Sequence, residues 1–389
     1  MKILMVSDSI FPDNIGGSYK YLFDLTQELV KKNDVSAIVS DKKNLASQEN
    51  IGKVKIFRYK RNRKNKIFDF YSFYKGAKDA TAHFNSSDFD VIHFHWPLPA
   101  LGVLRSKKLQ DAKKIYTFHG PWPEEYCFEI QDKYPRIFIK FLKWFFGIIE
   151  KNILKKMDKI ICASEFMRNK LIELYGKDFE RKIIIIPIGI NLGKYQKIFL
   201  FSKNKARERL NLPTQSKIIF TARRLYKRMG LENLIEAFGL FIKKNPDAFL
   251  LIAGKGPEKQ KLEEISHKLK LLSKIKFLGF VDEEKLPLYY RAVDVFVLPT
   301  IKLEGFGLVI LESFAIGCPV LGTPVGAIPE VLENFDRSFI LKSTRPEDIA
   351  GGIEKFFNQK GKTKSIFNKA DNFDISKTAK EIENVYKAK

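Results

Sequence analysis

Residues 304–324 read EGFGLVILESFAIGCPVLGTP, and this stretch gives the first indication of the fold. A glycine-rich turn that begins at Glu304 leads into an apolar run typical of a buried helix, with Gly317 as its expected C-cap. A second glutamate, Glu312, lies inside that run, where a carboxylate is costly unless a partner binds it. The stretch therefore predicts a loop and a helix with one carboxylate in each, followed by a short strand.

Strand-like and helix-like segments alternate along the whole chain. The first half contains the apolar runs KILMVSD, DVSAIVS, KVKIFRY, FDVIHFHW, KKIYTFHG, DKIICAS and KIIIIPIGI, and the second contains KIIFTAR, AFLLIAG, KIKFLGF, VDVFVLPT and CPVLGTP. Runs that are apolar on both faces are typical of parallel sheets covered by helices. The alternation predicts an α/β protein with two doubly wound domains, 1–190 and 191–372, and a final helix within 373–389 that packs back on the first domain. Ligands of such sheets bind at the carboxyl ends of the strands, so we expect the site in the cleft between the domains.

Composition narrows the class of protein. The chain has 389 residues, of which 45% are hydrophobic, and this is ample for two large cores. Cys127, Cys162 and Cys318 are scattered, so neither a disulfide framework nor a zinc site is indicated. The N-terminus lacks the pattern of a signal peptide, and no window reaches the ~18 apolar residues of a membrane span. We expect a cytoplasmic protein, either free or peripheral on the inner face of the membrane.

The net charge of +24 comes from 69 Lys and Arg against 45 Asp and Glu. Nucleic acid, an anionic membrane surface and a phosphate-bearing substrate would each be attracted by such a field. A bias in genome base composition towards lysine codons would also produce it. The charge alone does not choose among these four explanations.

A cationic loop follows the strand KIIFTAR. Arg223, Arg224, Lys227 and Arg228 fall within six positions of one another, where fixed cations could neutralise a leaving diphosphate. The alternative is an ordinary solvated basic loop.

Two glycine turns have the same strand–loop–helix setting. Gly254 and Gly256 follow the strand AFLLIAG, and Gly16 and Gly17 stand at the start of a helix in the first half. Helix starts with free backbone amides favour anions. Such turns are common, so each is weak support by itself.

The histidines of the first half suggest a second cluster. His93 and His95 lie on the same side of one strand, and His119 ends another. This placement permits a metal, but no nearby carboxylate or third ligand is evident in the sequence. We therefore predict no metal site.

The segment from Glu304 to Glu312 resembles the E-x7-E signature of the retaining family 4 glycosyltransferases. The flanks GFVDEEKLPLYYRAVDVFVLPT and GCPVLGTPVGAIPEVL are similar to the donor domain of that family, and the likeness extends over nearly the whole chain. The resemblance implies the GT-B fold, with two facing Rossmann-like domains that use a nucleotide diphosphate sugar.

The resemblance also implies roles for individual residues. Glu312 resembles the glutamate that binds the donor ribose, and Glu304 resembles the first glutamate, near the donor sugar. His119 resembles an active-site histidine that contacts that sugar. The remaining donor-binding positions implied by the resemblance are Gly16, Gly17, Gly254, Gly256, Val281, Gly305, Phe306 and Gly307.

One position departs from the family pattern of an arginine followed, five residues later, by Lys-Gly. Arg224 matches the arginine and Gly230 the glycine, but Met229 stands at the lysine position. We expect Arg228 or Lys227 to supply the missing charge.

The segment PRIFIKFLKWFFGIIEKNILKKMDK is rich in Phe and Ile, with a narrow polar stripe. The stripe consists of Arg136, Lys140, Lys143, Glu150, Lys151 and Lys155. The spacing fits either a helix lying in a membrane interface or a core helix of the first domain. YKRNRKNKIFDFYSFYKG is a second basic and aromatic segment of the same half, and together they favour an anionic leaflet.

Together, these features predict retaining transfer of a hexose-type sugar to an acceptor hydroxyl, in polysaccharide or glycolipid synthesis. The expected partners are a nucleotide-sugar donor, a sugar or lipid-linked acceptor and an anionic membrane surface, with no metal, no separate cofactor and no nucleic acid. Two alternatives are a nucleotide-sugar epimerase or phosphorylase of the same fold, and a basic nucleic-acid-binding protein. The second would leave the phosphate-type loops unexplained.

Overall fold

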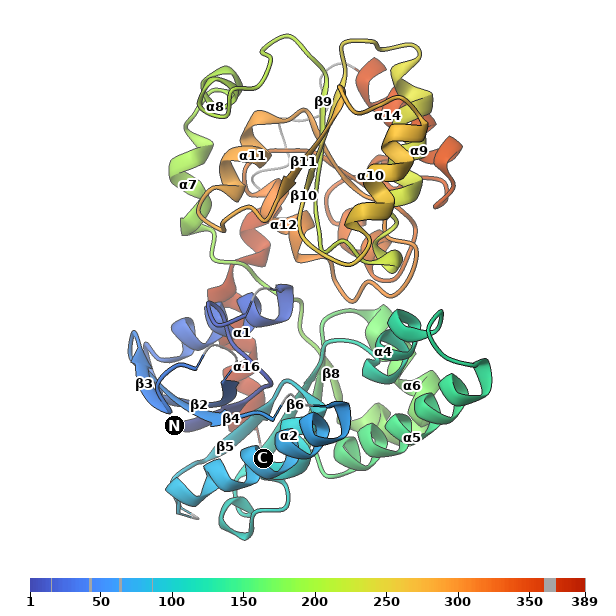
Figure 1. Ribbon diagram of the computed structural model, residues 1–389. Coiled ribbons are helices and arrows are strands. Elements are labelled where there is room, and N and C mark those ends of the chain that lie inside the picture. Colours follow the sequence, from blue (N-terminus) through green and yellow to red (C-terminus); the bar gives the residue numbers. More distant parts are fainter. Residues whose placement is uncertain (15, 42–43, 63–64, 86, 360–368, 389) are drawn as a thin grey trace. The chain divides into compact units, whose positions relative to one another are not determined.

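The computed structural model describes residues 1–389 except 15, 42–43, 63–64, 86, 360–368 and 389 (Figure 1). The chain divides into two compact units. The first is Met1–Ile190 together with Ile375–Lys389, and the second is Asn191–Asp374. Each unit is built on its own β-sheet with helices packed against it, which is the α/β architecture predicted from the sequence.

The first unit contains an eight-stranded sheet in the order β3-β4-β2-β1-β5-β6-β7-β8. All neighbours pair in parallel except β3, which is antiparallel to β4 at the edge. The strands are β1 Lys2–Val6, β2 Asp34–Asp41, β3 Gln48–Ile51, β4 Val54–Lys60, β5 Val91–Phe94, β6 Lys113–Phe118, β7 Lys159–Cys162 and β8 Ile183–Ile185. Seven of these correspond to predicted runs. The edge strand β3 was missed because its sequence, QENI, is mostly polar.

The described helices of this unit cover the sheet. They are α1 Gly17–Leu29, α2 Lys66–Ala80, α3 Pro97–Val103, α4 Trp122–Ile130, α5 Arg136–Lys155, α6 Glu165–Tyr175 and α16 Ile375–Lys387, with 3-10 turns at Thr81–His83, Lys107–Leu109 and Lys177–Lys182. None of the described helices is long and apolar enough to cross a membrane.

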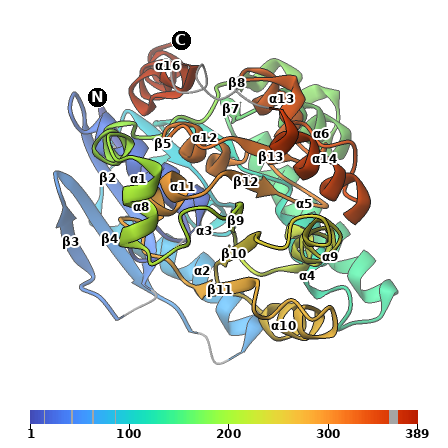
Figure 2. The same ribbon diagram turned by 90° about the horizontal axis from the view of Figure 1, so that it is seen from above.

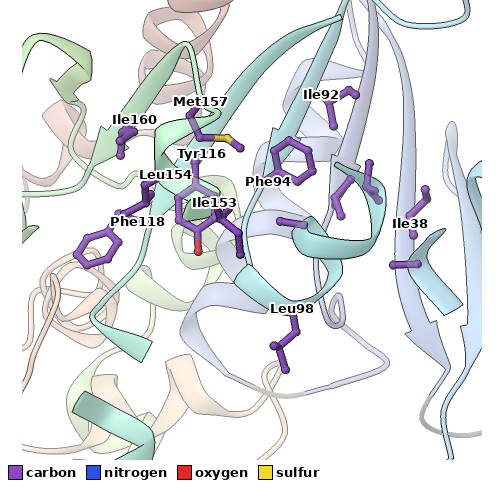
Figure 3. Close-up of a cluster of buried hydrophobic side chains, with 14 of the residues drawn as sticks. Ile38, Ile92, Phe94, Leu98, Tyr116, Phe118, Ile153, Leu154, Met157 and Ile160 are labelled. Carbon is purple, nitrogen blue, oxygen red and sulfur yellow. The ribbon is translucent and has the colours of Figure 1, made fainter. Parts of the chain in front are cut away.

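A large apolar cluster lies between this sheet and its helices (Figure 3). Phe94 of β5, Tyr116 of β6 and Ile160 of β7 meet Ile153 and Leu154 of α5 there, and all are at most 2% exposed. Burying one such side chain contributes roughly 1.5–3 kcal/mol. The C-terminal end of α5 is therefore held firmly against the sheet.

The C-terminal helix α16 belongs to the first unit. Its first residue, Ile375, donates its backbone N–H to the carbonyl of Ile190 at 2.9 Å. Near its other end, the Tyr386 hydroxyl lies 2.6 Å from Nδ1 of His93, a fully buried residue of β5. The helix thus supplies a hydrogen-bond partner to a buried polar group of the sheet.

The second unit contains a five-stranded, fully parallel sheet in the order β11-β10-β9-β12-β13 (Figure 2). The strands are β9 Ile218–Ala222, β10 Phe249–Ala253, β11 Ile275–Gly279, β12 Val295–Leu298 and β13 Val320–Gly322. The described helices are α7 Gly193–Phe199, α8 Lys203–Arg209, α9 Leu231–Ile242, α10 Lys259–Lys268, α11 Leu286–Ala292, α12 Leu308–Phe314, α13 Ile328–Glu333 and α14 Pro346–Asn358, with 3-10 turns at Lys227–Met229 (η4), Arg337–Phe339 and Asp371–Phe373. All five strands were predicted.

The chain order of these strands determines where a ligand can bind. Counted within the second unit, the order is 3-2-1-4-5, so the direction of chain progression reverses between β9 and β12. Ligands of open α/β sheets bind beyond the carboxyl ends of the strands at such a switch point. The first unit has the same kind of reversal between β1 and β5.

Candidate active site

The loops that leave β9 and β12 at the switch point are joined by an ion pair. Nη2 of Arg223 lies 2.5 Å from Oε2 of Glu304, and Nη1 donates to the Thr300 hydroxyl at 2.5 Å. The Thr300 hydroxyl also donates to Oε2 of Glu304, at 3.3 Å. The side chains of Arg223 and Glu304 are only 8% and 13% exposed. This is a nearly buried, charge-assisted network at the carboxyl edge of the sheet.

The network keeps Glu304 ionised. Burial alone would raise the pKa of this carboxyl, but the charge and hydrogen bond of Arg223, with contributions from Arg228 and Thr300, outweigh burial and lower it. Glu304 is therefore a carboxylate at neutral pH, and one of its oxygens already accepts two hydrogen bonds. This arrangement suits an orienting group better than a free nucleophile.

The four cations of the β9 loop are arranged differently from one another. Arg223, for which the sequence predicts no individual role, forms an ion pair with Glu304. Arg224 is exposed, with its guanidinium carbon 5.2 Å from the centre of the Tyr226 ring. Lys227 is also exposed, whereas Arg228 is only 6% exposed and donates to the carbonyl of Leu303 at 2.7 Å.

The methionine at the expected lysine position is part of the core. Met229 is 4% exposed, at the end of the 3-10 turn η4. Its neighbour Arg228 lies close enough to Glu304 to help to lower its pKa, and Lys227 is exposed. The two cations considered as replacements are thus placed differently, one within the loop network and one at the surface.

The turn with Gly254 and Gly256 supports the β9 loop directly. A Cβ at Gly254 would lie 1.7 Å from the carbonyl oxygen of Arg223, and one at Gly256 would lie 2.2 Å from that of Leu225. Backbone hydrogen bonds from Arg223 to Ala253 and from Leu225 to Lys255, at 2.9 and 3.0 Å, join the two loops. The packing of the chain itself therefore requires these glycines, independently of any ligand.

The remaining predicted positions of the second unit lie on neighbouring loops of the same edge. Val281 follows β11 and is half-buried. Gly305 is half-buried, and Phe306 is 6% exposed with its ring centre 6.3 Å from that of Phe373. Gly307 has φ +84°, a left-handed conformation that favours glycine, and begins α12.

Glu312 has a protein partner in the core. Its carboxylate is 4% exposed and accepts a hydrogen bond from the Tyr290 hydroxyl at 3.1 Å. Burial, and then the charge of Glu312, raise the pKa of Tyr290 well above its ordinary value, so the phenol keeps its proton and remains a donor. The sequence did not identify Tyr290, which lies 22 residues earlier on α11.

In the first unit, three histidines form a row at the carboxyl ends of β5 and β6. The ring centres of His93 and His95 are 4.2 Å apart, and those of His95 and His119 are 5.3 Å apart. Nδ1 of His95 lies 3.1 Å from Nε2 of His119, while Nε2 of His93 lies 2.7 Å from the Thr117 hydroxyl. Within the described residues, no group of three His, Cys, Asp or Glu side chains could hold a metal.

Burial keeps these three rings neutral. It lowers the pKa of His93 to about 3 and that of His119 to about 4, and it lowers that of His95 well below the ordinary value. His119 is therefore a neutral hydrogen-bonding group at physiological pH. Gly16 and Gly17, at the N-terminus of α1, follow β1 on the same sheet.

A cavity of about 630 Å³ opens elsewhere in the second unit. Its lining includes Val293 and Asp294, before β12, and Pro319, before β13, so it lies at the amino ends of these strands. Asp294 already pairs with Lys203 and Arg207 at 2.8 Å each. Because doubly wound sheets bind ligands at the opposite edge, we do not assign the active site to this cavity.

Comparison with known proteins agrees with this architecture. The model of the family described as Glycosyltransferase Family 4 matches residues 15–194, and that of Glycosyl transferases group 1 matches residues 202–373. The chain is a family 4 glycosyltransferase of the GT-B fold. An uncharacterized glycosyltransferase of Methanocaldococcus jannaschii is 25% identical to it, over 100% of this chain and 98% of the relative. The alpha-monoglucosyldiacylglycerol synthase of Streptococcus pneumoniae is 27% identical, over 72% of this chain and 62% of that enzyme.

Solved structures of the same fold cover nearly the whole glycosyltransferase chain. Sucrose-phosphate synthase from Thermosynechococcus elongatus has a TM-score of 0.81 at 20% identity, covering 99% of this chain and 98% of the other. HepE from Anabaena, solved in complex with UDP-glucose, has a TM-score of 0.73 at 17% identity, with 98% of each chain covered. At these identities the likeness establishes the fold alone.

Removing one partner of the Arg223–Glu304 pair should be strongly destabilising. Arg223→Met leaves a nearly buried carboxylate without its cation, so we expect the unfolding free energy to fall by about 3–5 kcal/mol. The double variant Arg223→Met/Glu304→Leu removes both charges and should recover most of that loss. Urea denaturation of the unmodified protein and of each variant measures the free energy of unfolding. As a control, Asp282→Asn breaks an exposed pair with Lys285 and should cost less than about 1 kcal/mol. Equal, small losses of unfolding free energy in Arg223→Met and in Asp282→Asn would contradict this account.

The histidine row should make stability depend on pH. Each ring is neutral when folded and protonated when unfolded below pH ~6.5, so acidification destabilises the protein. Glu150, whose pKa burial raises to about 8, acts in the opposite direction over the same range, because the folded state holds its proton. From about pH 7 to about pH 5.5 these terms sum to a net loss of about 2 kcal/mol. Glu150→Gln removes the compensation and should raise the loss to about 4 kcal/mol.

Denaturation at the two pH values measures this difference within each variant. His93→Gln should reduce the loss, while His83→Gln, which changes an exposed histidine, should leave it unchanged. Identical pH dependence in all four proteins would show that the row is not the source.

Proposed function

We propose that this glycosyltransferase moves a hexose-type sugar from a nucleotide diphosphate sugar to an acceptor hydroxyl, with retention of the anomeric configuration. The observation that carries the proposal is the network of Arg223, Thr300 and Glu304 at the β9–β12 switch point, with the exposed cations Arg224 and Lys227 on the same loop. The complex of HepE with UDP-glucose supports a nucleotide-sugar donor.

The cations of the β9 loop are suited to stabilise a nucleotide diphosphate as the leaving group. When the bond between the sugar and the phosphate oxygen breaks, negative charge grows on the diphosphate, and fixed cations stabilise it without reorganisation. Arg224 and Lys227 are exposed at the surface, where a diphosphate could reach them, and Arg228 and Arg223 contact the loop of Glu304. Glu304 would accept hydrogen bonds from sugar hydroxyls through its other oxygen and so position the ring.

Retention follows most simply from a reaction on one face of the sugar. The acceptor oxygen forms its bond to the anomeric carbon on the face from which the diphosphate leaves, and the acceptor proton passes to a phosphate oxygen. A two-step route would need a free carboxylate on the opposite face, and Glu304, held by Arg223, does not suit that role. The roles implied for Gly16, Gly17 and His119 remain predictions.

The acceptor is proposed to be a sugar or a lipid-linked sugar in polysaccharide or glycolipid synthesis. A relative named for glucosylation of a diacylglycerol lipid supports a membrane-associated acceptor. No metal or separate cofactor is required by the proposed route, because side-chain cations stabilise the leaving group.

The proposal is tested with a panel of uridine and guanosine diphosphate sugars. At least one should raise the melting temperature and be slowly hydrolysed, and proton NMR of the freshly released sugar should show the anomer of the donor. If no nucleotide sugar shifts the melt while DNA binds tightly and with strong salt dependence, the enzyme proposal is wrong.

Arg224→Ala should lower turnover of the active donor by about 10²-fold, because it removes a cation from the leaving group. Arg337→Ala changes another exposed arginine of the second unit, 87% exposed, and should leave turnover unchanged.

Glu312→Ala, in contrast, should abolish the melting-temperature shift that the active donor causes. Full activity in both site variants would refute the assignment.

A further inference from the structure

The outer face of α5 is apolar where a surface helix is normally polar. The most exposed apolar residues of this helix follow the spacing i, i+4, i+7 and i+11, which places them in one stripe. Ile137, Phe141, Trp144 and Ile148 are 81%, 54%, 61% and 40% exposed, and Phe138 and Phe145 beside them are 41% each. We call these six residues the α5 stripe.

The opposite face of the same helix is the one that packs on the protein. Ile153 and Leu154 lie in the apolar cluster of the first unit (Figure 3). Further along, the ring centre of Phe146 lies 4.6 Å from that of Trp122 and 6.2 Å from that of Phe70 on α2. The core-helix interpretation therefore accounts for only one side of α5, and the stripe needs a separate explanation.

The helix α2, which belongs to the second basic and aromatic segment, contacts α5 through the ring of Phe70. The stacking of Phe70 on Phe146 places α2 next to α5, and α2 exposes Phe68 and Tyr71 by 52% and 54%. Eight large exposed apolar side chains thus lie on two helices that contact each other through Phe70 and Phe146. Contiguous apolar patches of this kind mark interaction sites rather than ordinary surface.

The exposed charges along α5 are all positive. Arg136, Lys140 and Lys155 are exposed and Lys151 is half-buried. The one acidic residue of the helix, Glu150, is 1% exposed and accepts a hydrogen bond from the Tyr175 hydroxyl. The whole exposed length of the helix therefore presents aromatic and aliphatic groups flanked by cations.

This combination selects an anionic lipid surface among the possible partners. Trp and Phe with flanking Lys and Arg are typical of helices that lie in the headgroup region, with long basic side chains reaching the phosphates. A two-fold contact between two copies of this chain would bring the same cationic flanks towards each other. The net charge of +24 adds attraction towards an anionic leaflet.

We propose that the α5 stripe, with Phe68 and Tyr71 of α2, docks this protein onto the surface of an anionic lipid bilayer. The α5 helix would lie along the interface without crossing it. The inference stands on exposure and charge alone, so it is independent of the donor and of the reaction.

Co-sedimentation with vesicles tests the proposal on the full chain. Vesicles of equal parts phosphatidylglycerol and phosphatidylcholine should bind the protein, and pure phosphatidylcholine should bind it much less. The variant Ile137→Gln/Phe141→Gln/Trp144→Gln should bind at least about tenfold more weakly, because it removes the inserted apolar surface. The variant Arg136→Gln/Lys140→Gln/Lys151→Gln should bind about tenfold to a hundredfold more weakly. Lys143 is left in place because it pairs with Glu124 at 2.7 Å.

Two matched variants of the second unit are the controls. Leu240→Gln/Leu269→Gln/Leu272→Gln removes exposed apolar side chains that lie outside the stripe, at 39%, 43% and 53% exposure. Lys243→Gln/Lys268→Gln/Lys276→Gln removes the same charge as the basic variant from exposed positions. Both should bind like the unmodified protein. Equal loss in a control and in its α5 counterpart would overturn the assignment to α5.

Trp144 offers a direct reading of insertion. Its fluorescence should shift to the blue when anionic vesicles are added, and the shift should be absent in Trp144→Phe, in which the more buried Trp96 and Trp122 remain. Absence of any shift in the unmodified protein would overturn the proposal. So would self-association in the absence of lipid that the Ile137→Gln/Phe141→Gln/Trp144→Gln variant abolishes, since a second copy would then cover the stripe.

Discussion

The ion pair between Arg223 and Glu304 joins two loops that are far apart in the sequence and adjacent only because β9 and β12 are neighbours in the sheet. Two further contacts act on the same loops. The turn at Gly254 packs beneath Arg223, and Arg228 binds the loop before Glu304. Three loops are thereby fixed relative to one another before any donor binds. Such preorganisation lets fixed charges act on a leaving group without the cost of reorienting them.

Both units place buried polar groups near the carboxyl ends of their strands, and two of these groups have clear hydrogen-bond partners. Glu312 receives the Tyr290 hydroxyl, and His93 is held between Tyr386 and Thr117. Buried polar groups are costly unless they are hydrogen-bonded, so these contacts support the fold at the edge where a doubly wound sheet carries its ligand. Pairing with Tyr290 also explains how an apolar helix can contain Glu312 in the free protein.

The sequence predicted the fold well because continuous apolar runs are a strong signal for parallel strands. It missed β3, since a polar edge strand has no such signal. Within the site, the resemblance singles out Glu304 and Arg224, but nothing in the sequence indicates that Arg223 is the arginine that pairs with Glu304. Which of two adjacent side chains turns inward depends on the local backbone after the strand. Tyr290, and the contact between His95 and His119, depend on tertiary packing between separate elements, which one sequence does not reveal.

The α5 helix illustrates the same limit in another way. Its sequence fits burial on either side, and only the packing of Ile153 and Leu154 shows which face turns inward. Once that face is known, the exposure of Trp144 follows from helical geometry. The structure was therefore needed to show which face of this amphipathic helix is buried and which is exposed.

The central claim is that the loops after β9 and β12 bind the nucleotide diphosphate of the donor. Hydrogen exchange with and without UDP and GDP, followed by mass spectrometry, tests it most directly. The account predicts that one of these nucleotides protects the backbone of residues 223–230 and 300–312. Protection confined to residues 290–294 and 317–321, at the opposite edge of the sheet, would contradict it.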